Sequence, residues 1–301
     1  MKKAVVFWVE EYLYNPKILQ KLLSFSILPL SWFYCFIMYL RFKLQVPEDF
    51  GIQIISVGNL TVGGSGKTPL VTTLAKKYAM PAVILRGYGR ESSGMIIVKD
   101  AQEILCDVHQ SGDEAMIYAK KLPNAVVIVS EKRKPAIKKA KELGCEVIFL
   151  DDAYSKHDIK KQEILIDIET QNDFCLPSGP YRERLWHGID ALVVKEGIDF
   201  VREVQLQNPT QKMSLVTAIA RPQRLDAYLP KSIMAKHYFE DHHSFTKEEL
   251  EAILQDDNAS SLLVTFKDYV KMESFGLPLS LLDLEVKVNE RTFKSFILSF
   301  F

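Results

Sequence analysis

The stretch that decides the fold is IISVGNLTVGGSGKTPL, residues 54–70. An apolar run enters a glycine-rich turn, and Lys67, Thr68 and Pro69 then begin a helix. Glycines let successive backbone N–H groups wrap a phosphate, to which the helix N-terminus adds its partial positive charge. Lys67 would reach the β- and γ-phosphate oxygens, and the Thr68 hydroxyl would ligate Mg²⁺. The predicted nucleotide-binding residues are Thr61, Val62, Gly63, Gly64, Ser65, Gly66, Lys67 and Thr68.

One position departs from the usual phosphate-loop pattern G-x-x-x-x-G-K-[ST]. Thr61 stands where its first glycine is expected, whereas the later glycine, the lysine and the threonine are present. The alternative is a plain strand-to-helix connection whose glycines occur by chance. The apolar run before the loop and the helix after it favour phosphate binding, because the motif requires that context.

Downstream of Pro47 the chain alternates short apolar runs with helical stretches. The apolar runs lack strict alternation, as strands buried on both faces do. They are residues 52–57, 82–85, 125–129, 146–150, 164–168 and 191–195, with helices expected at 67–78, 114–121 and 134–143. This order predicts an α/β fold of the P-loop NTPase type, with a mostly parallel sheet and flanking helices.

The last third of the chain predicts a smaller α/β region. Strands are expected at 214–218 and 261–265, and a capping box at 246–249 opens a helix to about residue 254. We therefore expect three parts. They are an N-terminal segment 1–45, a phosphate-loop core 46–210, and a C-terminal domain 211–301 that carries an Asp-His-His loop.

A hydrophobic segment lies near the N-terminus. Residues 22–40 are 19 residues without a charge, flanked on both sides by basic residues. This is about the length of a helix that crosses a hydrocarbon core, but Pro29 and three serines equally favour an interfacial or re-entrant anchor. A buried core helix is the third interpretation. The segment predicts contact with a membrane and leaves the geometry open.

Composition limits the class of protein. The chain has 301 residues, 48% of them hydrophobic, which suits one large or two modest globular domains. Its 38 basic and 38 acidic residues balance, so no nucleic-acid partner is expected. The four cysteines are scattered without a CxxC pair and are interpreted as reduced cytosolic thiols. No obligatory protein partner is evident.

Three clusters of polar residues are candidates for chemistry. Asp151 and Asp152 follow an apolar run and suit the acidic metal ligand that a phosphate loop requires, although such a pair is also common in turns. Asp113 and Glu114 precede a helix, where Asp113 could be only a cap. The neighbours His242 and His243 point in different directions, which makes them a poor metal pair.

Together the motifs resemble those of the tetraacyldisaccharide 4′-kinases, the lipid A 4′-kinases of Gram-negative bacteria. The similarity extends over nearly the whole chain after residue 50, and the hydrophobic N-terminus is also similar to theirs. In chain order the motifs are VGNLTVGGSGKTP, RGYGR (86–90), SGDE (111–114), DDAYSKH (151–157), GPYRE (179–183), ARP (220–222), FEDHHSF (239–245) and TFKDYVK (265–271).

This resemblance implies a reaction and a site. ATP would donate its γ-phosphoryl group to the 4′-hydroxyl of an acylated glucosamine disaccharide 1-phosphate, at the cytoplasmic face of the inner membrane. Asp113 would be the general base, partnered by His242 rather than His243. The implied ligands of Mg²⁺ are Thr68, Asp151, Asp152 and Glu183, with Glu114, Arg86 and Arg182 as further site candidates.

The chain departs from the family in one motif. Relatives commonly carry Asp-Asp-Gly-Phe-Gln-His, whereas here Lys156 stands at the histidine position and His157 follows it. One alternative function stays open from the sequence: a membrane-tethered P-loop ATPase that acts as a conformational switch. A nucleotide-binding scaffold without catalysis is disfavoured, because the lysine, hydroxyl and acidic groups are all present.

Overall fold

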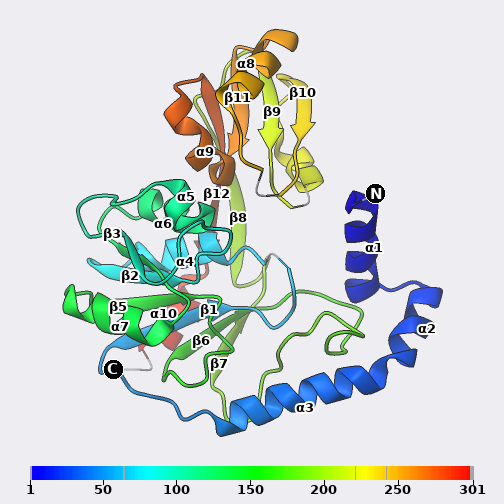
Figure 1. Ribbon diagram of the computed structural model, residues 1–301, viewed down its shortest axis with the longest axis vertical. Helices are drawn as coiled ribbons and strands as arrows, with labels where there is room; N and C mark the ends of the chain where they lie inside the picture. The colour runs from blue at the N-terminus through cyan, green and yellow to red at the C-terminus, as the bar shows by residue number, and fades with distance from the viewer. Residues whose placement is uncertain (1, 64, 221, 242, 299–301) are drawn as a thin grey trace. The chain divides into compact units, whose positions relative to one another are not determined.

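A computed structural model describes residues 2–63, 65–220, 222–241 and 243–298. Its helices and strands are labelled in Figure 1. The larger sheet has seven strands in the order β3-β4-β2-β5-β1-β6-β7, and every pairing that is described is parallel except that of β3 with β4. The predicted mostly parallel α/β fold is therefore confirmed. A second sheet has five strands in the order β10-β9-β11-β12-β8.

The chain divides into two compact units. The first contains residues 1–67, 149–199 and 289–301, and the second contains 68–148 and 200–288. The predicted parts 1–45, 46–210 and 211–301 are a division by chain order and stay a prediction.

The first unit holds the N-terminal helices and part of the parallel sheet. Strands β1 and β6 are buried almost throughout, as expected for runs of Ile, Val and Leu between layers, whereas β7 at the edge of the sheet is partly exposed. Its elements are α1 (Lys2–Tyr14), α2 (Ile18–Ser26), α3 (Leu28–Leu44), β1 (Gln53–Gly58), the end of β5 (Val147–Asp151), β6 (Gln162–Ile166), β7 (Ala191–Val194) and α10 (Glu290–Leu298).

The second unit begins within α4 (Lys67–Ala75) and contains the remaining elements. Those before residue 148 are β2 (Pro81–Leu85), β3 (Ile96–Lys99), α5 (Val108–Ser111), α6 (Asp113–Lys121), β4 (Val126–Val129) and α7 (Arg133–Glu142). Those after residue 200 are β8 (Phe200–Gln207), β9 (Met213–Thr217), the 3₁₀ helix η1 (Pro222–Tyr228), β10 (Ile233–Tyr238), α8 (Lys247–Asp256), β11 (Ser261–Thr265), α9 (Phe266–Met272), η2 (Glu273–Phe275) and β12 (Leu279–Val288).

The five-stranded sheet has an apolar core on each face. Val216, Leu262 and Val264 pack with Leu250 and Ile253 of α8 on one face. Met213, Leu215, Leu263 and Leu282 form the other core cluster. Half of the predicted capping box is present, because the Thr246 hydroxyl accepts a hydrogen bond from the Glu249 N–H at 3.2 Å, whereas the Glu249 carboxylate contacts His243. Strands β3, β8, β10 and β12 were not predicted from the sequence.

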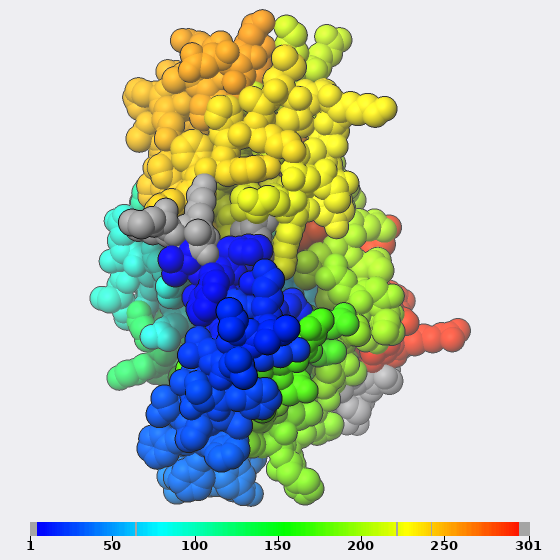
Figure 2. All heavy atoms as spheres, turned by 90° about the vertical axis from the view of Figure 1, so that its right-hand side faces the viewer, coloured from blue at the N-terminus to red at the C-terminus, as the bar shows by residue number. Residues whose placement is uncertain are grey.

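The hydrophobic N-terminal segment is two helices instead of one. α2 ends at Ser26 and α3 begins at Leu28, with the axes bent by 59° and Pro29 in the first turn of α3, where proline is tolerated. Within the described residues no single helix is long and apolar enough to cross a bilayer, whereas this bent pair meets the length and composition criteria. In Figure 2 the blue surface is formed by α1–α3. It exposes Phe7, Ile18, Leu19, Trp32 and Phe33, among others.

Two of the four scattered cysteines meet in the fold. Cys35 lies on α3 and Cys175 in the loop after β6, and their sulfur atoms are 2.7 Å apart. All four cysteines are free thiols.

Candidate active site

The predicted phosphate loop joins β1 to α4. β1 is buried up to Gly58, Asn59 is 1% exposed, and α4 begins at Lys67. Gly63 and Gly66 have φ angles of 95° and 72°, which side chains other than glycine rarely adopt. Gly64 lies outside the described residues. Gly63 and Gly66 are therefore needed for the backbone path of the loop.

Lys67 is held at the loop by three polar groups. Its ammonium donates to Asn59 Oδ1 at 3.0 Å and to Ser65 Oγ at 3.4 Å, and it lies 3.5 Å from Asp152 Oδ1. The Asn59 amide in turn donates to the Thr61 carbonyl at 2.6 Å. These contacts hold the Lys67 ammonium beside the glycine-rich loop.

Of the predicted acidic pair Asp151 and Asp152, the second residue contacts this lysine. It follows β5 with a φ of 51°, a left-handed conformation that aspartate tolerates, and its carboxylate pairs with Lys67 and with Arg182. Burial alone would raise the pKa of Asp152, but these two cations lower it below its ordinary value. Asp151, the last residue of β5, is 4% exposed.

Glu183 is a buried carboxylate at the same place. It is 7% exposed, and its N–H donates to the Leu60 carbonyl at 3.1 Å. Burial raises its pKa, opposed by the charge of Arg41 and, more weakly, by the nearby Trp186 indole and by Arg182. No described residue donates a hydrogen bond to its Oε2 atom. A buried acceptor of this kind suits a ligand or a metal ion.

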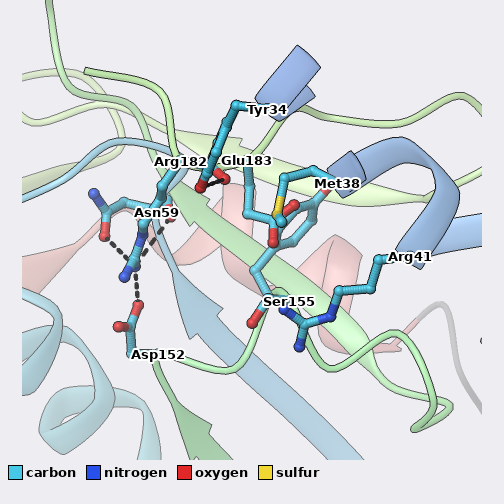
Figure 3. A pocket seen from close by; sticks show the side chains of 9 residues that line it. Tyr34, Met38, Arg41, Asn59, Asp152, Ser155, Arg182 and Glu183 are labelled. Carbon is cyan, nitrogen blue, oxygen red and sulfur yellow. Dashed lines mark hydrogen bonds and ion pairs between the residues drawn. The ribbon is translucent and has the colours of Figure 1, made fainter. Parts of the chain in front are cut away.

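Of the residues described so far, Asn59, Asp152, Arg182 and Glu183 line a pocket of about 170 Å³, shown in Figure 3. α3 supplies Tyr34, Met38 and Arg41, and the Tyr34 hydroxyl donates to the Arg182 carbonyl at 3.0 Å. The guanidinium of Arg182 lies between Asn59 and Asp152 in the view. The whole lining is Tyr34, Met38, Arg41, Asn59, Asp152, Tyr154, Ser155, Arg182 and Glu183, all from the first unit.

Three carboxylates predicted as metal ligands, at positions 151, 152 and 183, belong to this unit, and Thr68 is in the first turn of α4. Within the described residues, no group of three or more His, Cys, Asp or Glu side chains is arranged to hold a metal ion. Mg²⁺ usually takes only one or two protein carboxylates and completes its shell with phosphate and water. The donor set therefore fits Mg²⁺ bound together with a nucleotide.

Asp113 lies in the second unit, at the start of α6. Its carboxylate pairs with the ammonium of Lys271 on α9 at 3.1 Å, and the two side chains are 13% and 9% exposed. Lys271 also donates to the carbonyl of His243 at 3.3 Å. Lys271 thus connects the predicted base to the Asp-His-His loop, a link that the sequence analysis missed although Lys271 ends the motif TFKDYVK.

The two histidines of that loop differ in what the structure says of them. His242 lies outside the described residues, so its predicted partnership with Asp113 stays a prediction. The ring of His243 is 3.0 Å from Glu249 and lies between Phe239 and Phe245, with ring centres 4.7 and 4.9 Å away. These contacts direct His243 toward α8.

The remaining candidates lie apart from these pairs. Glu114 is exposed on α6, and Arg86 is exposed directly after β2. His157 is 7% exposed and packs edge-on against Tyr154 and Phe42, each with ring centres 5.1 Å away. Burial, together with Lys161 and Arg41, lowers its pKa to about 4, so this histidine is neutral at physiological pH.

An aromatic cluster surrounds His157 and joins α3 to the pocket wall. Trp186 lies 5.5 Å from Tyr39 and 6.1 Å from Phe42, measured between ring centres. The backbone N–H of Trp186 donates a hydrogen bond to the hydroxyl oxygen of Tyr154 at 3.3 Å. Asn59, Tyr34 and Arg41 were also missed as site residues. Only Asn59 had a sequence signal, because it directly precedes the glycine-rich turn.

Comparison with known proteins identifies the relatives of this chain. A family model described as LpxK, tetraacyldisaccharide-1-P 4′-kinase, matches residues 23–213 and 199–301. The tetraacyldisaccharide 4′-kinase of Aliarcobacter butzleri is 47% identical over 96% of this chain and 95% of its own length. That of Helicobacter pylori is 45% identical over 93% of this chain and 91% of its own. The crystal structure of LpxK from Aquifex aeolicus in complex with ATP matches with a TM-score of 0.76 and 26% identity, covering 93% of this chain and 99% of that one.

Proposed function

This chain belongs to the tetraacyldisaccharide-1-P 4′-kinase family, and from that premise we propose how its residues carry out the reaction. The enzyme is an ATP-dependent kinase of lipid A biosynthesis. It transfers the γ-phosphoryl group of ATP to the 4′-hydroxyl of a tetraacyldisaccharide 1-phosphate. What we propose is the role of each residue, the ligands of Mg²⁺ and the location of the protein at the membrane.

The observation that carries the proposal is the position of Lys67. Its ammonium is held by Asn59 and Asp152 at the start of a helix that follows a glycine-rich loop. When a triphosphate binds, the Lys67 ammonium would exchange its contact with Asn59 for contacts with phosphate oxygens, because a phosphate oxygen carries more charge than an amide oxygen. Lys67 and Arg182 would then neutralise charge on the transferring group, which is the main contribution that proteins make to phosphoryl transfer.

Of the predicted ligands Asp151, Asp152 and Glu183, one or two carboxylates would hold Mg²⁺ beside the phosphates, with Thr68 as a hydroxyl ligand. Bound there, the ion supplies further charge neutralisation at the transferring phosphoryl group. The unsatisfied Oε2 atom of Glu183 supports this assignment. When triphosphate and metal bind, the Lys67–Asp152 pair would separate, the lysine toward phosphate and the carboxylate toward the cation.

Asp113 would act as the general base on the acceptor hydroxyl. A sugar hydroxyl is a weak nucleophile, so a carboxylate that takes its proton during attack accelerates transfer. Lys271 holds that carboxylate from a different element and is a positioning residue for it. Because Asp113 sits at the first position of α6, the helix N-terminus also favours its charged form.

The membrane is the proposed location of the substrate and of α1–α3. Large apolar side chains cover these helices, with Leu19 79% and Trp32 66% exposed. An acceptor with four acyl chains stays in a bilayer, and an enzyme on the same surface meets it more often. We place the protein at the cytoplasmic face of the inner membrane, where ATP is available.

A direct assay tests the proposal. Purified protein is mixed with Mg-ATP labelled at the γ-phosphate and a detergent-dispersed tetraacyl disaccharide 1-phosphate, beside the variant Asp113→Ala. Label in the lipid that falls sharply in the variant supports the assigned roles. ATP hydrolysis that leaves the lipid unlabelled would favour the alternative, a membrane-tethered switch ATPase.

A further inference from the structure

The N-terminal helix α1 reaches the phosphate loop through one side chain. The hydroxyl of Tyr14, the last residue of α1, donates a hydrogen bond to the carbonyl of Val62. The next residue, Gly63, is so close that a Cβ built on it would lie 3.8 Å from the same hydroxyl. Tyr14, which is far from the loop in sequence, therefore contacts the Val62–Gly63 peptide bond within the loop.

Tyr14 is itself fixed at its backbone. Its carbonyl accepts hydrogen bonds from the Gln171 N–H at 2.9 Å and from the Thr170 hydroxyl at 3.2 Å. On the loop side, the N–H of Val62 donates to the Pro180 carbonyl at 2.9 Å. Val62 is thus held at its N–H by one segment and at its C=O by another, all within the first unit.

The direction of one peptide plane follows from this contact. In a trans peptide the C=O and the following N–H point in opposite directions. With the Val62 carbonyl held toward Tyr14, the N–H of Gly63 points away from it. Gly63 has a φ of 95° and no side chain, so without this hydrogen bond little opposes rotation of that peptide. The opposite orientation would present a carbonyl oxygen in place of an N–H to a phosphate.

We propose that Tyr14 is a positioning residue for nucleotide binding: its hydroxyl keeps the Val62–Gly63 peptide oriented with its N–H available to a phosphate of ATP. The inference rests on the proposed role of residues 61–68 as the nucleotide site. Its consequence is that α1 contributes to ATP affinity as well as to the apolar N-terminal surface.

The test compares Tyr14→Phe with Tyr12→Phe. Tyr12 lies on the same helix, and its hydroxyl donates to the Pro177 carbonyl at 3.1 Å, so its variant also loses one hydrogen bond between α1 and the loop after β6. We expect Tyr14→Phe to raise KM for ATP and the Kd for Mg-ATP about three- to tenfold, the usual worth of one hydrogen bond. Its kcat and its KM for the lipid should stay within about twofold of wild type, and Tyr12→Phe should leave the ATP constants unchanged.

Four results separate the possibilities. Equal rises in KM for ATP in both variants, or an unchanged Kd for Mg-ATP in Tyr14→Phe, would overturn the inference. A loss of kcat in Tyr14→Phe that parallels a lower Tm would also overturn it, by showing a structural role only. Failure of the wild-type protein to bind ATP would instead overturn the proposed function.

Discussion

Two lysine–aspartate pairs occupy the two regions for which we propose a function, and they differ in surroundings. Lys67 and Asp152 are 3.5 Å apart; the lysine side chain is 15% exposed, whereas the carboxylate is 38% exposed and shared with Arg182. Lys271 and Asp113 are 3.1 Å apart and both nearly buried. Asp152 of the first pair lines a pocket together with Arg182 and Glu183, whereas the second pair joins α6 to α9.

The difference indicates two uses of the same interaction. A pair whose carboxylate is exposed and has extra polar partners is easily exchanged for a ligand, since a triphosphate can replace the carboxylate and a metal ion can replace the ammonium. A buried pair keeps its geometry, because separating it leaves an uncompensated charge. We infer that the first pair is a ligand site in its unliganded arrangement and that the second is a permanent support for a reacting carboxylate.

The largest expected effect comes from Asp113→Asn. Removing a general base should lower kcat about 10³-fold, while the Kd for Mg-ATP stays near the wild-type value. Steady-state transfer of labelled phosphoryl to lipid and equilibrium ATP binding measure the two quantities. Loss of ATP affinity equal to the loss of turnover would contradict the separation of the two regions.

Lys67→Met is expected to lower kcat/KM for ATP about 10²- to 10³-fold, because a cation beside the transferring phosphoryl group is lost. Lys67→Arg is the matched control for charge and should recover part of the activity. The measurement is turnover as a function of ATP concentration at saturating lipid. A variant that lost only stability, with unchanged ATP kinetics in the folded fraction, would show that the pair is structural.

Lys271→Met should lower kcat about 10- to 100-fold through the position of Asp113. In the background of Asp113→Asn the same change should have almost no effect, since the two residues act as a unit. Lys271→Arg should restore part of kcat. Lys120→Met is the control, because Lys120 lies on α6 with Asp113 but pairs with Glu273, outside the Asp-His-His loop. Additive losses in the double variant would disprove the positioning role.

His157 gives the smallest expected effect on turnover and a measurable one on stability. Its folded pKa is about 4 against an ordinary 6.5, so between these values the unfolded chain binds a proton that the folded protein does not. The free energy of unfolding should therefore fall as pH falls, by about 2 kcal/mol between about pH 7.5 and about pH 5. His157→Phe should remove this slope.

Denaturant unfolding of both proteins at the two pH values measures the slope. The exposed His187, changed to Phe, is the control and should leave the slope as it is. A slope that persists in His157→Phe would assign the pH dependence to other groups.

The sequence predicted what is local and missed what is distant. The phosphate loop and its flanking strand and helix are contiguous, so residues 54–70 were enough to place them. The link from Lys271 to Asp113 joins α9 to α6, and nothing in either segment alone indicates it. From the sequence, Tyr34 and Arg41 were assigned only to the hydrophobic N-terminal segment. A run of apolar residues does not show which side chains in or beside it face a pocket.

The break at Ile27 shows a different limit. Residues 22–40 are one uncharged stretch, and Pro29 within it argued against a straight span without locating the break between two helices. Proline fits the first turn of a helix and not its interior, and it therefore marks the start of α3. Strands β8, β10 and β12 were missed for a related reason, since their burial patterns are mixed and give no continuous apolar run.

The fluorescence of Trp186 can be used to follow the packing of the aromatic cluster around it. The chain has three tryptophans: Trp8 on α1 and Trp32 on α3 are largely exposed, whereas Trp186 packs against Tyr39 and Phe42 of α3. With Trp186 as the sole tryptophan, its emission would follow whether α3 stays packed against the pocket wall. With Trp8 or Trp32 alone, quenching by labelled lipids would record which helix enters a bilayer, and to what depth.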